Sequence, residues 1–181
     1  MASTFPRARK LGYDIAQVED FLEEARRAYM ADPRQPGVLD AASIRSMAFA
    51  MQRGGYSTNH VDAALERLED AFAQRERERF LAESGDAAWY AKARASAQVV
   101  LDRLSRPEGQ RFTRTNLFTE GYDVKEVDAF ADRLVAYFQQ GKAMTIDQVR
   151  TVAFRSRKRG YSETQVDAVL DAVVDIMLAV R

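Results

Sequence analysis

The chain has 181 residues and contains no cysteine and only one histidine. The absence of cysteine excludes disulfides, thiol nucleophiles and thiolate metal sites, and it is compatible with a reducing cytosol. The single histidine, His60, is expected near the start of a helix, where capping or solvent exposure is favoured over catalysis or metal binding. The 27 basic and 27 acidic residues cancel, so the protein as a whole has no bulk attraction for nucleic acid or anionic lipid.

Long apolar runs are also missing. The most apolar stretch, "AVLDAVVDIMLAV" at 168–180, is interrupted by Asp171 and Asp175 and is shorter than the roughly 20 residues that a membrane-spanning helix requires. Glycine-rich phosphate loops, metal-ligand spacings and nucleophile motifs are absent as well. We therefore expect a cytoplasmic protein that is not an enzyme, with no catalytic residue, no metal and no cofactor.

The sequence does contain one phrase that occurs four times. Its copies are "KLGYDIAQVEDFL" at 10–22, "RGGYSTNHVDAAL" at 53–65, "TEGYDVKEVDAFA" at 119–131 and "KRGYSETQVDAVL" at 158–170. Each Gly-Tyr is followed by Asp or Ser and, three residues later, by Gln, His or Glu. Three of the four copies fit a capping box, so each phrase predicts the start of a helix.

The residues around each phrase predict helices on both sides of it. After each phrase, apolar residues recur at the spacing of one helix face, and we expect them to form the core. The glycine before each tyrosine is where a short preceding helix would end, because glycine adopts the left-handed conformation at little cost. We therefore expect an all-α fold whose unit is helix, Gly-Tyr turn, helix. The expected core residues are Val18, Leu22, Ala25, Tyr29, Val61, Leu65, Leu68, Phe72, Val127, Ala131, Leu134, Phe138, Val166, Leu170, Val173 and Met177.

The copies alternate between two types, which indicates the duplication of a pair. The first and third read "GYD", whereas the second and fourth read "GYS" and follow the related segments "IRSMAF" and "VRTVAF". We expect two related helical lobes at 1–72 and 112–181, joined by a helical connector at 73–111. In the connector, a helix should extend to about Ser84, restart at "GD" and carry Trp89 toward a core.

The most complete copies, "GYDIAQVEDFL" and "GYDVKEVDAF", carry a family resemblance. Their frame of Gly-Tyr-Asp, three residues, Val-Asp/Glu, one residue and Phe resembles the N-terminal motif of the DivIVA family of bacterial division and polar-growth scaffolds. The four-copy arrangement is similar to actinobacterial DivIVA-domain repeat proteins. The resemblance implies an adaptor or scaffold of cell division or polar growth, located at the septum or pole. No long heptad run follows the motifs, so polymerisation through a coiled coil is not implied.

Each copy also places two carboxylates six and ten residues after its tyrosine. A spacing of four puts both on one helix face, where an arginine could pair with carboxylate and stack on a tyrosine ring. In a relative of the DivIVA family, an equivalent tyrosine and acids hold arginine-bearing cytoplasmic tails of cell-wall synthases, and the resemblance implies the same role here. The alternative is that the early-helix acids favour the helix dipole and form a solvated outer face, and that the tyrosine belongs to the core. The candidate residues are Tyr13, Glu19, Glu23, Tyr56, Asp62, Glu66, Tyr122, Asp128, Asp132, Tyr161, Asp167 and Asp171.

Basic residues cluster near aromatic ones before the Gly-Tyr phrases. In DivIVA proteins an exposed aromatic beside a basic residue enters the bilayer surface, and "FPR" at 5–7 resembles that arrangement. Each basic residue near an anionic leaflet contributes about 1 kcal/mol. The alternative is an ordinary solvated charge run that pairs with neighbouring acids. The candidate membrane contacts are Phe5, Arg7, Arg9, Lys10, Phe112, Arg114, Arg155 and Arg157.

A helix-turn-helix DNA-binding regulator is the alternative function, because the stretch at 44–65 superficially has that arrangement. The candidate recognition helices, however, open with acids rather than with the Arg, Asn or Gln that read base edges. We therefore expect no nucleic acid partner. The expected partners are cell-division or cell-wall-synthesis proteins, and an anionic membrane and a second copy of the chain are left open.

Overall fold

The computed structural model describes residues 5–31 and 39–180, and most of these residues are helical. The chain divides into two compact units, Met1–Glu83 and Ser84–Arg181. No helix within the described part of the chain is long and apolar enough to cross a membrane.

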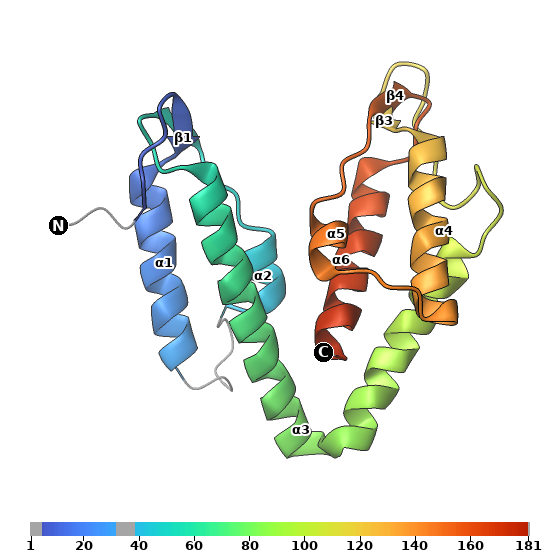
Figure 1. The fold of residues 1–181 in the computed structure, drawn as a ribbon, viewed down its shortest axis with the longest axis horizontal. Helices are drawn as coiled ribbons and strands as arrows, with labels where there is room; N and C mark the ends of the chain where they lie inside the picture. The colour runs from blue at the N-terminus through green and yellow to red at the C-terminus, as the bar shows by residue number, and fades with distance from the viewer. Residues whose placement is uncertain (1–4, 32–38, 181) are drawn as a thin grey trace. The chain divides into compact units, whose positions relative to one another are not determined.

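The first unit combines three helical segments with one small sheet (Figure 1). Two strands pair antiparallel, with Leu11 opposite Arg53 and Tyr13 opposite Met51. Isolated bridges join Tyr56 to Arg7 and to Tyr13, so the sheet continues beyond its short strands. The elements are β1 (Leu11–Tyr13), α1 (Ile15–Met30), α2 (Ala41–Arg45), β2 (Met51–Arg53) and the first part of α3 (Thr58–Leu104).

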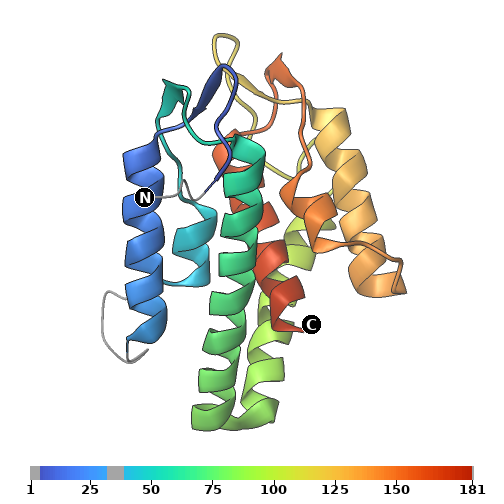
Figure 2. The same ribbon diagram turned by 60° about the vertical axis from the view of Figure 1, so that its left-hand side comes forward.

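The second unit has the same order of elements after the second part of α3. Its strands pair antiparallel, with Glu120 opposite Lys158 and Tyr122 opposite Ser156, and Tyr161 forms bridges to Arg114 and Tyr122. In each unit the sheet lies at one end of its helices (Figure 2). The further elements are β3 (Glu120–Tyr122), α4 (Val124–Gln140), α5 (Ile146–Arg150), β4 (Ser156–Lys158) and α6 (Glu163–Ala179).

Helix α3 passes from one unit into the other and is interrupted at Gly85. The φ and ψ angles of this glycine, 77° and 165°, are not helical. The expected restart at "GD" is therefore confirmed. The second part of α3 contributes Ala93, Val100 and Leu104 to buried positions of the second unit, and the Trp89 indole Nε1 donates to the Ala179 carbonyl at 2.7 Å. The expectation of a core role for this part of the connector agrees with these contacts.

The small sheets correct the expected all-α fold. Each Gly-Tyr phrase follows or contains a β-strand or bridge, and not the end of a short helix. The glycine of the phrase therefore does not end a helix, as was expected. A Cβ on Gly121 would collide with the Tyr161 carbonyl oxygen and would lie 2.9 Å from Thr115 Cγ2. Gly12 meets the Tyr56 carbonyl in the same way. These glycines are needed because two backbones approach closely, as glycine in strands commonly allows.

Two of the predicted caps form, but the capping boxes do not close as expected. The Asp14 carboxylate accepts from the Gln17 N–H at 3.0 Å, and Asp123 accepts from Lys125 and Glu126. Ser162 makes no side-chain cap hydrogen bond. The residues expected to complete the boxes instead bind distant backbone N–H groups that precede a companion copy: Gln17 accepts from Ala50 N–H, Glu126 from Arg155 N–H and Gln165 from Thr113 N–H.

The cores of both units are built from the predicted apolar faces. In the first unit Val18, Ala25, Val61 and Phe72 are buried, and in the second unit all but two of the eight expected residues are buried. Tyr29 is 42% exposed, although its ring packs against Phe72 with centroids 5.3 Å apart. Burial of these side chains supplies most of the stabilisation that holds each helix pair together.

Candidate functional site

The motif tyrosines contact carboxylates of the companion copy. The Tyr56 hydroxyl, from the second copy, donates to Glu19 of the first. The Tyr161 hydroxyl, from the fourth copy, donates to the Asp128 carboxylate of the third at 3.0 Å. Both tyrosines are fully buried. Each pair of copies therefore forms its tyrosine–carboxylate contact by exchange, and not within one copy as the sequence spacing suggested.

Tyr13 and Tyr122, from the first and third copies, in turn interact with carboxylates of the second and fourth copies, Asp62 and Asp167. Burial, followed by hydrogen bonding and the negative charge of Asp62, raises the pKa of Tyr13 above its ordinary value. Burial also raises the pKa of Tyr122, with a further contribution from the charge of Asp167. The rings of these two tyrosines are only partly buried, unlike those of Tyr56 and Tyr161. Each unit therefore contains one deep and one shallow tyrosine–carboxylate contact.

The carboxylates ten residues after each motif tyrosine lie in different environments. Asp132 forms an ion pair, whereas Glu23 is exposed and forms no ion pair with another described residue. Glu66 is half-buried on the first part of α3, and Asp171 is exposed on α6. Among the described residues, the predicted pair Asp128 and Asp132 is brought together on one cation.

That cation is Arg111, which with Asp128, Asp132 and Tyr161 forms what we call the Arg111 cluster. The Arg111 Nη2 lies 2.5 Å from the Asp132 carboxylate, and Nη1 donates to the Asp128 carbonyl at 2.5 Å. Its Nε lies 3.7 Å from the Asp128 carboxylate, and its backbone N–H donates to the Tyr161 hydroxyl. The Gly109 N–H donates to the same carboxylate at 2.7 Å. The guanidinium is thus held by the Asp132 carboxylate and by the backbone carbonyls of Asp128 and Arg106, with the Asp128 carboxylate at longer range, whereas the contact with Tyr161 comes from the Arg111 backbone.

Arg111 and Asp128 are buried, although the Asp132 side chain of the same cluster is 54% exposed, and this burial makes the pairing of Arg111 with Asp128 energetically important. Arg111 is 5% exposed and Asp128 is 4% exposed, so each charge is removed from water and requires the other. Burial raises the pKa of Tyr161; the adjacent Asp128 carboxylate raises it further, while the Arg111 backbone N–H and the charge of Arg114 oppose the shift. The tyrosine therefore stays a neutral donor to the carboxylate at physiological pH.

The corresponding side chains of the first unit, Glu19, Glu23 and Tyr56, form what we call the Glu19 cluster. Phe5 packs edge-on against the Tyr56 ring at 5.4 Å, and the Arg7 guanidinium lies over that ring at 5.1 Å. Glu19 and Glu23 are both solvent-exposed. The carboxylates of this cluster therefore face water, in contrast to the buried Asp128.

The candidate membrane residues are largely engaged in contacts within the protein. Phe112 is buried against Tyr161, with ring centroids 5.3 Å apart, and Arg114 lies over the same tyrosine ring. Arg155 pairs with Glu126 and Arg157 with Asp123, at 2.5 and 2.7 Å, so these basic residues follow the alternative of a charge run paired with acids. Arg9 and Lys10 are exposed.

Two features of the site were not predicted. Arg111 belonged to the expected connector, and its position just before Phe112 and the Gly-Tyr phrase was the available signal. The apolar side chains of Leu117 and Phe118, 56% and 93% exposed, lie in the loop before β3. That loop is fixed by Asn116, whose side-chain oxygen accepts from the Phe118 and Thr119 N–H groups. An apolar pair in a polar loop was the signal for this second feature.

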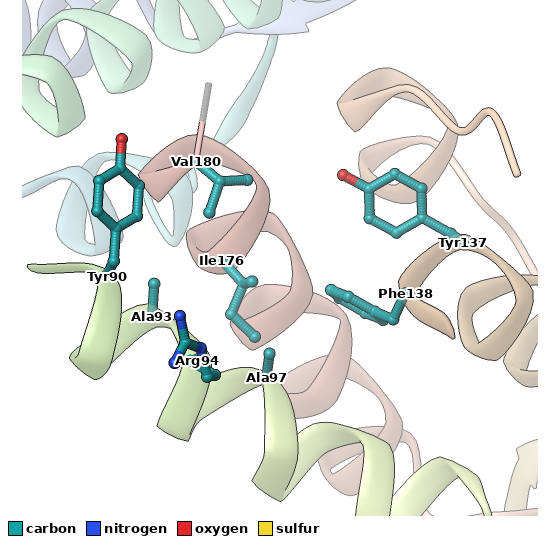
Figure 3. Close-up of a pocket in the computed structure, with 8 residues that line it drawn as sticks. All are labelled: Tyr90, Ala93, Arg94, Ala97, Tyr137, Phe138, Ile176 and Val180. Atoms are coloured by element: carbon teal, nitrogen blue, oxygen red, sulfur yellow. The ribbon is translucent and has the colours of Figure 1, made fainter. Parts of the chain in front are cut away.

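The second unit also contains an apolar groove of about 420 Å³ (Figure 3). The walls of the groove come from the second part of α3, the end of α4 and α6. Among the described residues that line it, Arg94 is the one with a charged side chain. None of its lining residues is among the predicted site residues. They are Tyr90, Ala93, Arg94, Ala97, Tyr137, Phe138, Ile176 and Val180.

No family model, no curated protein and no solved structure matches the chain. Carboxylates on one helix face provide acceptors for the planar donors of a guanidinium. The Arg111 cluster is an example of that binding within the same chain.

Proposed function

We propose that the protein is a non-enzymatic adaptor that holds arginine-bearing segments of partner proteins on its tyrosine–carboxylate clusters. The observation that carries this proposal is the guanidinium of Arg111 bound by Asp128 and Asp132 beside Tyr161. The motifs' resemblance to DivIVA scaffolds adds the biological setting. Within it, the partners are cell-division or cell-wall-synthesis proteins at the septum or pole, and the two units are duplicated DivIVA-like lobes.

The shared order of elements supports the proposed duplication. Both units have strand, long helix, short helix, strand and long helix in that order, and both bury the tyrosine of the later copy. The stretch that suggested a helix-turn-helix contains the strand β2 between α2 and α3. A recognition helix joined to its partner helix by a short turn is therefore missing there, and we favour a protein partner over DNA.

Binding of an arginine peptide tests the proposed function. The probe is a fluorescein-labelled Gly-Ser peptide with two arginines, and the matched control is the same peptide with neutral citrulline in place of arginine. We expect the full-length protein to increase the anisotropy of the arginine peptide at low salt, with the citrulline peptide at least tenfold weaker, because charge-assisted hydrogen bonds are lost. Equal binding of the two peptides would refute the proposal.

Membrane contact is a second proposed function, at different residues from those expected. Phe118 is 93% exposed, and the strand that follows its loop pairs with β4, which ends at Lys158 and is followed by Arg159. An exposed aromatic next to basic residues suits insertion into an anionic membrane surface. We propose that Leu117 and Phe118 enter the surface while Lys158 and Arg159 contact lipid headgroups.

Co-sedimentation with liposomes tests this second function. Binding to vesicles with anionic lipid should fall when Leu117 and Phe118 are both replaced by serine. Val99→Ser is the matched control, because Val99 is 70% exposed on α3 and lies outside the loop. If the double variant binds as well as the Val99→Ser protein, the loop does not contact the membrane.

A further inference from the structure

The apolar groove of the second unit has the size and lining of a small-molecule site (Figure 3). Its volume of about 420 Å³ lies in the range of about 300–1,000 Å³ that is typical of ligand pockets. Ala93 and Ile176 are buried at its base, whereas the lining residues Tyr90 and Val180 are 46% and 51% exposed. An apolar occupant would therefore remove exposed apolar surface from water, which stabilises the complex.

The first unit fills the corresponding place with a side chain of its own. Arg75 and Val180 each lie 19 residues after the buried motif tyrosine of their unit. The Arg75 guanidinium lies over the Tyr29 ring at 5.1 Å, and its nitrogens donate to the carbonyls of Ala28 and Ala31 at the end of α1. A valine cannot fill the space in this way, so the groove of the second unit stays open.

The end of α4 does not need such an arginine. Gly141 has φ of 66°, and its N–H donates to the Tyr137 carbonyl at 3.2 Å. The Lys142 N–H donates to the Ala136 carbonyl at 3.3 Å. A left-handed glycine commonly satisfies the last carbonyls of a helix through hydrogen bonds of this kind. The open groove therefore costs the second unit no hydrogen bond at this helix end.

One positive charge lies beside the apolar lining. Arg94 is exposed, and its side chain forms no ion pair or hydrogen bond with another described residue. A guanidinium only donates hydrogen bonds, and its planar fork matches the two oxygens of a carboxylate. The groove thus combines apolar walls with a single cation, which is complementary to an apolar molecule with one anionic group.

The lining also indicates an elongated ligand. On α3 it runs from Tyr90 to Ala97, which is about 10 Å at the helical rise of about 1.5 Å per residue. The small side chains of Ala93 and Ala97 leave space along this strip for an unbranched chain. We infer that the groove binds a free alkyl carboxylate, with its chain along α3 and its carboxylate on Arg94. This inference goes beyond the proposed function, because no lining residue belongs to the Arg111 or Glu19 cluster.

Calorimetric titration of the full-length protein with sodium octanoate tests the inference. We expect one octanoate to bind per chain. The matched ligand 1-octanol has the same chain length without the charge, and should bind at least about threefold more weakly because it cannot pair with an exposed arginine. Butyrate keeps the charge but lacks four methylenes, and should bind at least about 100-fold more weakly. Equal binding of octanoate and 1-octanol, or no binding of octanoate, would overturn the inference.

Paired variants test where the ligand binds. Arg94→Gln should weaken octanoate binding to the level of 1-octanol and leave 1-octanol unaffected, whereas Arg94→Lys should retain most of the difference. Ala97→Phe should fill the groove and abolish binding of both ligands. Ala95→Phe is the matched control, because Ala95 is exposed on the same helix and lies outside the lining. The fluorescence of Trp89, which donates to the Ala179 carbonyl, checks that each variant is folded.

Two further outcomes would assign the groove differently. Unchanged octanoate binding in both Arg94→Gln and Ala97→Phe would place the ligand elsewhere and overturn the inference. If the unaltered protein dimerises in analytical ultracentrifugation and Ala97→Phe is monomeric, a second copy occupies the groove, which also overturns it. Binding of the arginine peptide is measured without octanoate, so the proposed function is tested separately.

Discussion

Replacing Gly121 with alanine tests why the Gly-Tyr phrases contain glycine. A Cβ at this position would collide with the Tyr161 carbonyl oxygen and lie 3.0 Å from its carbon. The backbones of Tyr122 and Tyr161 exchange hydrogen bonds, from Tyr122 N–H to the Tyr161 carbonyl at 3.0 Å and from Tyr161 N–H to the Tyr122 carbonyl at 2.8 Å. The methyl group can be accommodated only if these backbones separate, so both hydrogen bonds are weakened together.

The expected cost follows from these two effects. Overpacking costs about 1–3 kcal/mol, and each backbone hydrogen bond contributes about 1 kcal/mol, so Gly121→Ala should lower the free energy of unfolding by about 3–5 kcal/mol. For a unit of about 100 residues, this corresponds to a decrease in melting temperature of at least about 12 °C. The matched control is Gly141→Ala. Gly141 has φ of 66° and open space around its Cβ position, so its replacement should cost only about 1–2 kcal/mol.

The single tryptophan provides the assay. Trp89 lies in the second unit and donates to the Ala179 carbonyl, so its fluorescence during urea unfolding reports on that unit alone. This matters because two units need not unfold in one transition. If Gly121→Ala is no more destabilising than Gly141→Ala, close backbone approach is not the reason for the glycine.

Three further predictions concern buried or paired charges. Glu69→Ala should destabilise the first unit by about 3 kcal/mol in thermal unfolding followed by circular dichroism, because it removes the carboxylate 2.7 Å from the part-buried Arg45. Asp123→Asn should lower the free energy of unfolding at neutral pH, because hydrogen bonding from Arg157 holds the pKa of Asp123 below its ordinary value. The difference in unfolding free energy between the variant and the unaltered protein should disappear as pH falls below about 4, where the carboxylate becomes protonated. Burial raises the pKa of Tyr161, so the unaltered protein should lose stability as pH rises above about 10, where this phenol ionises more readily in the unfolded state than in the folded state. Tyr161→Phe should remove that part of the alkaline loss of stability.

Each of these predictions has an outcome that contradicts it. For Glu69, the variant should be rescued when Arg45→Met accompanies it, and a double variant as unstable as the single one would show that the pair is not the cause. For Asp123, a stability difference that persists unchanged down to pH 2 would exclude the carboxylate charge. An alkaline unfolding profile of Tyr161→Phe identical to that of the unaltered protein would assign the alkaline transition to other groups.

Local chemistry made much of the fold predictable. The helix starts at Asp14 and Asp123 follow from side chains that cap nearby N–H groups, and the break at Gly85 follows from the backbone freedom of glycine. The apolar faces followed from helical spacing alone. All of these signals involve residues within a few positions of one another.

The rest depended on contacts between distant residues. Strands of three residues carry too little pattern to be seen, and their pairing joins Gly12 to Gln52 across two helices. The contacts of Arg111 were not predicted for the same reason, since its acceptors lie on α4 and its position just before Phe112 is the one local signal that points to them. The exchange of tyrosine contacts between copies was hidden because each copy, considered alone, already offers a tyrosine with two carboxylates at suitable spacing.

The exchanged contacts make the pair of copies the smallest complete unit. Gln17 binds the backbone at Ala50, and Tyr56 returns a hydrogen bond to Glu19, so neither copy of the first unit satisfies its own polar groups. Loss of one copy would remove these hydrogen-bond partners from the other, including the acceptor of the buried Tyr56 hydroxyl. Chains built from this motif should therefore gain and lose copies in twos, and an odd number would require a second molecule to supply the missing half.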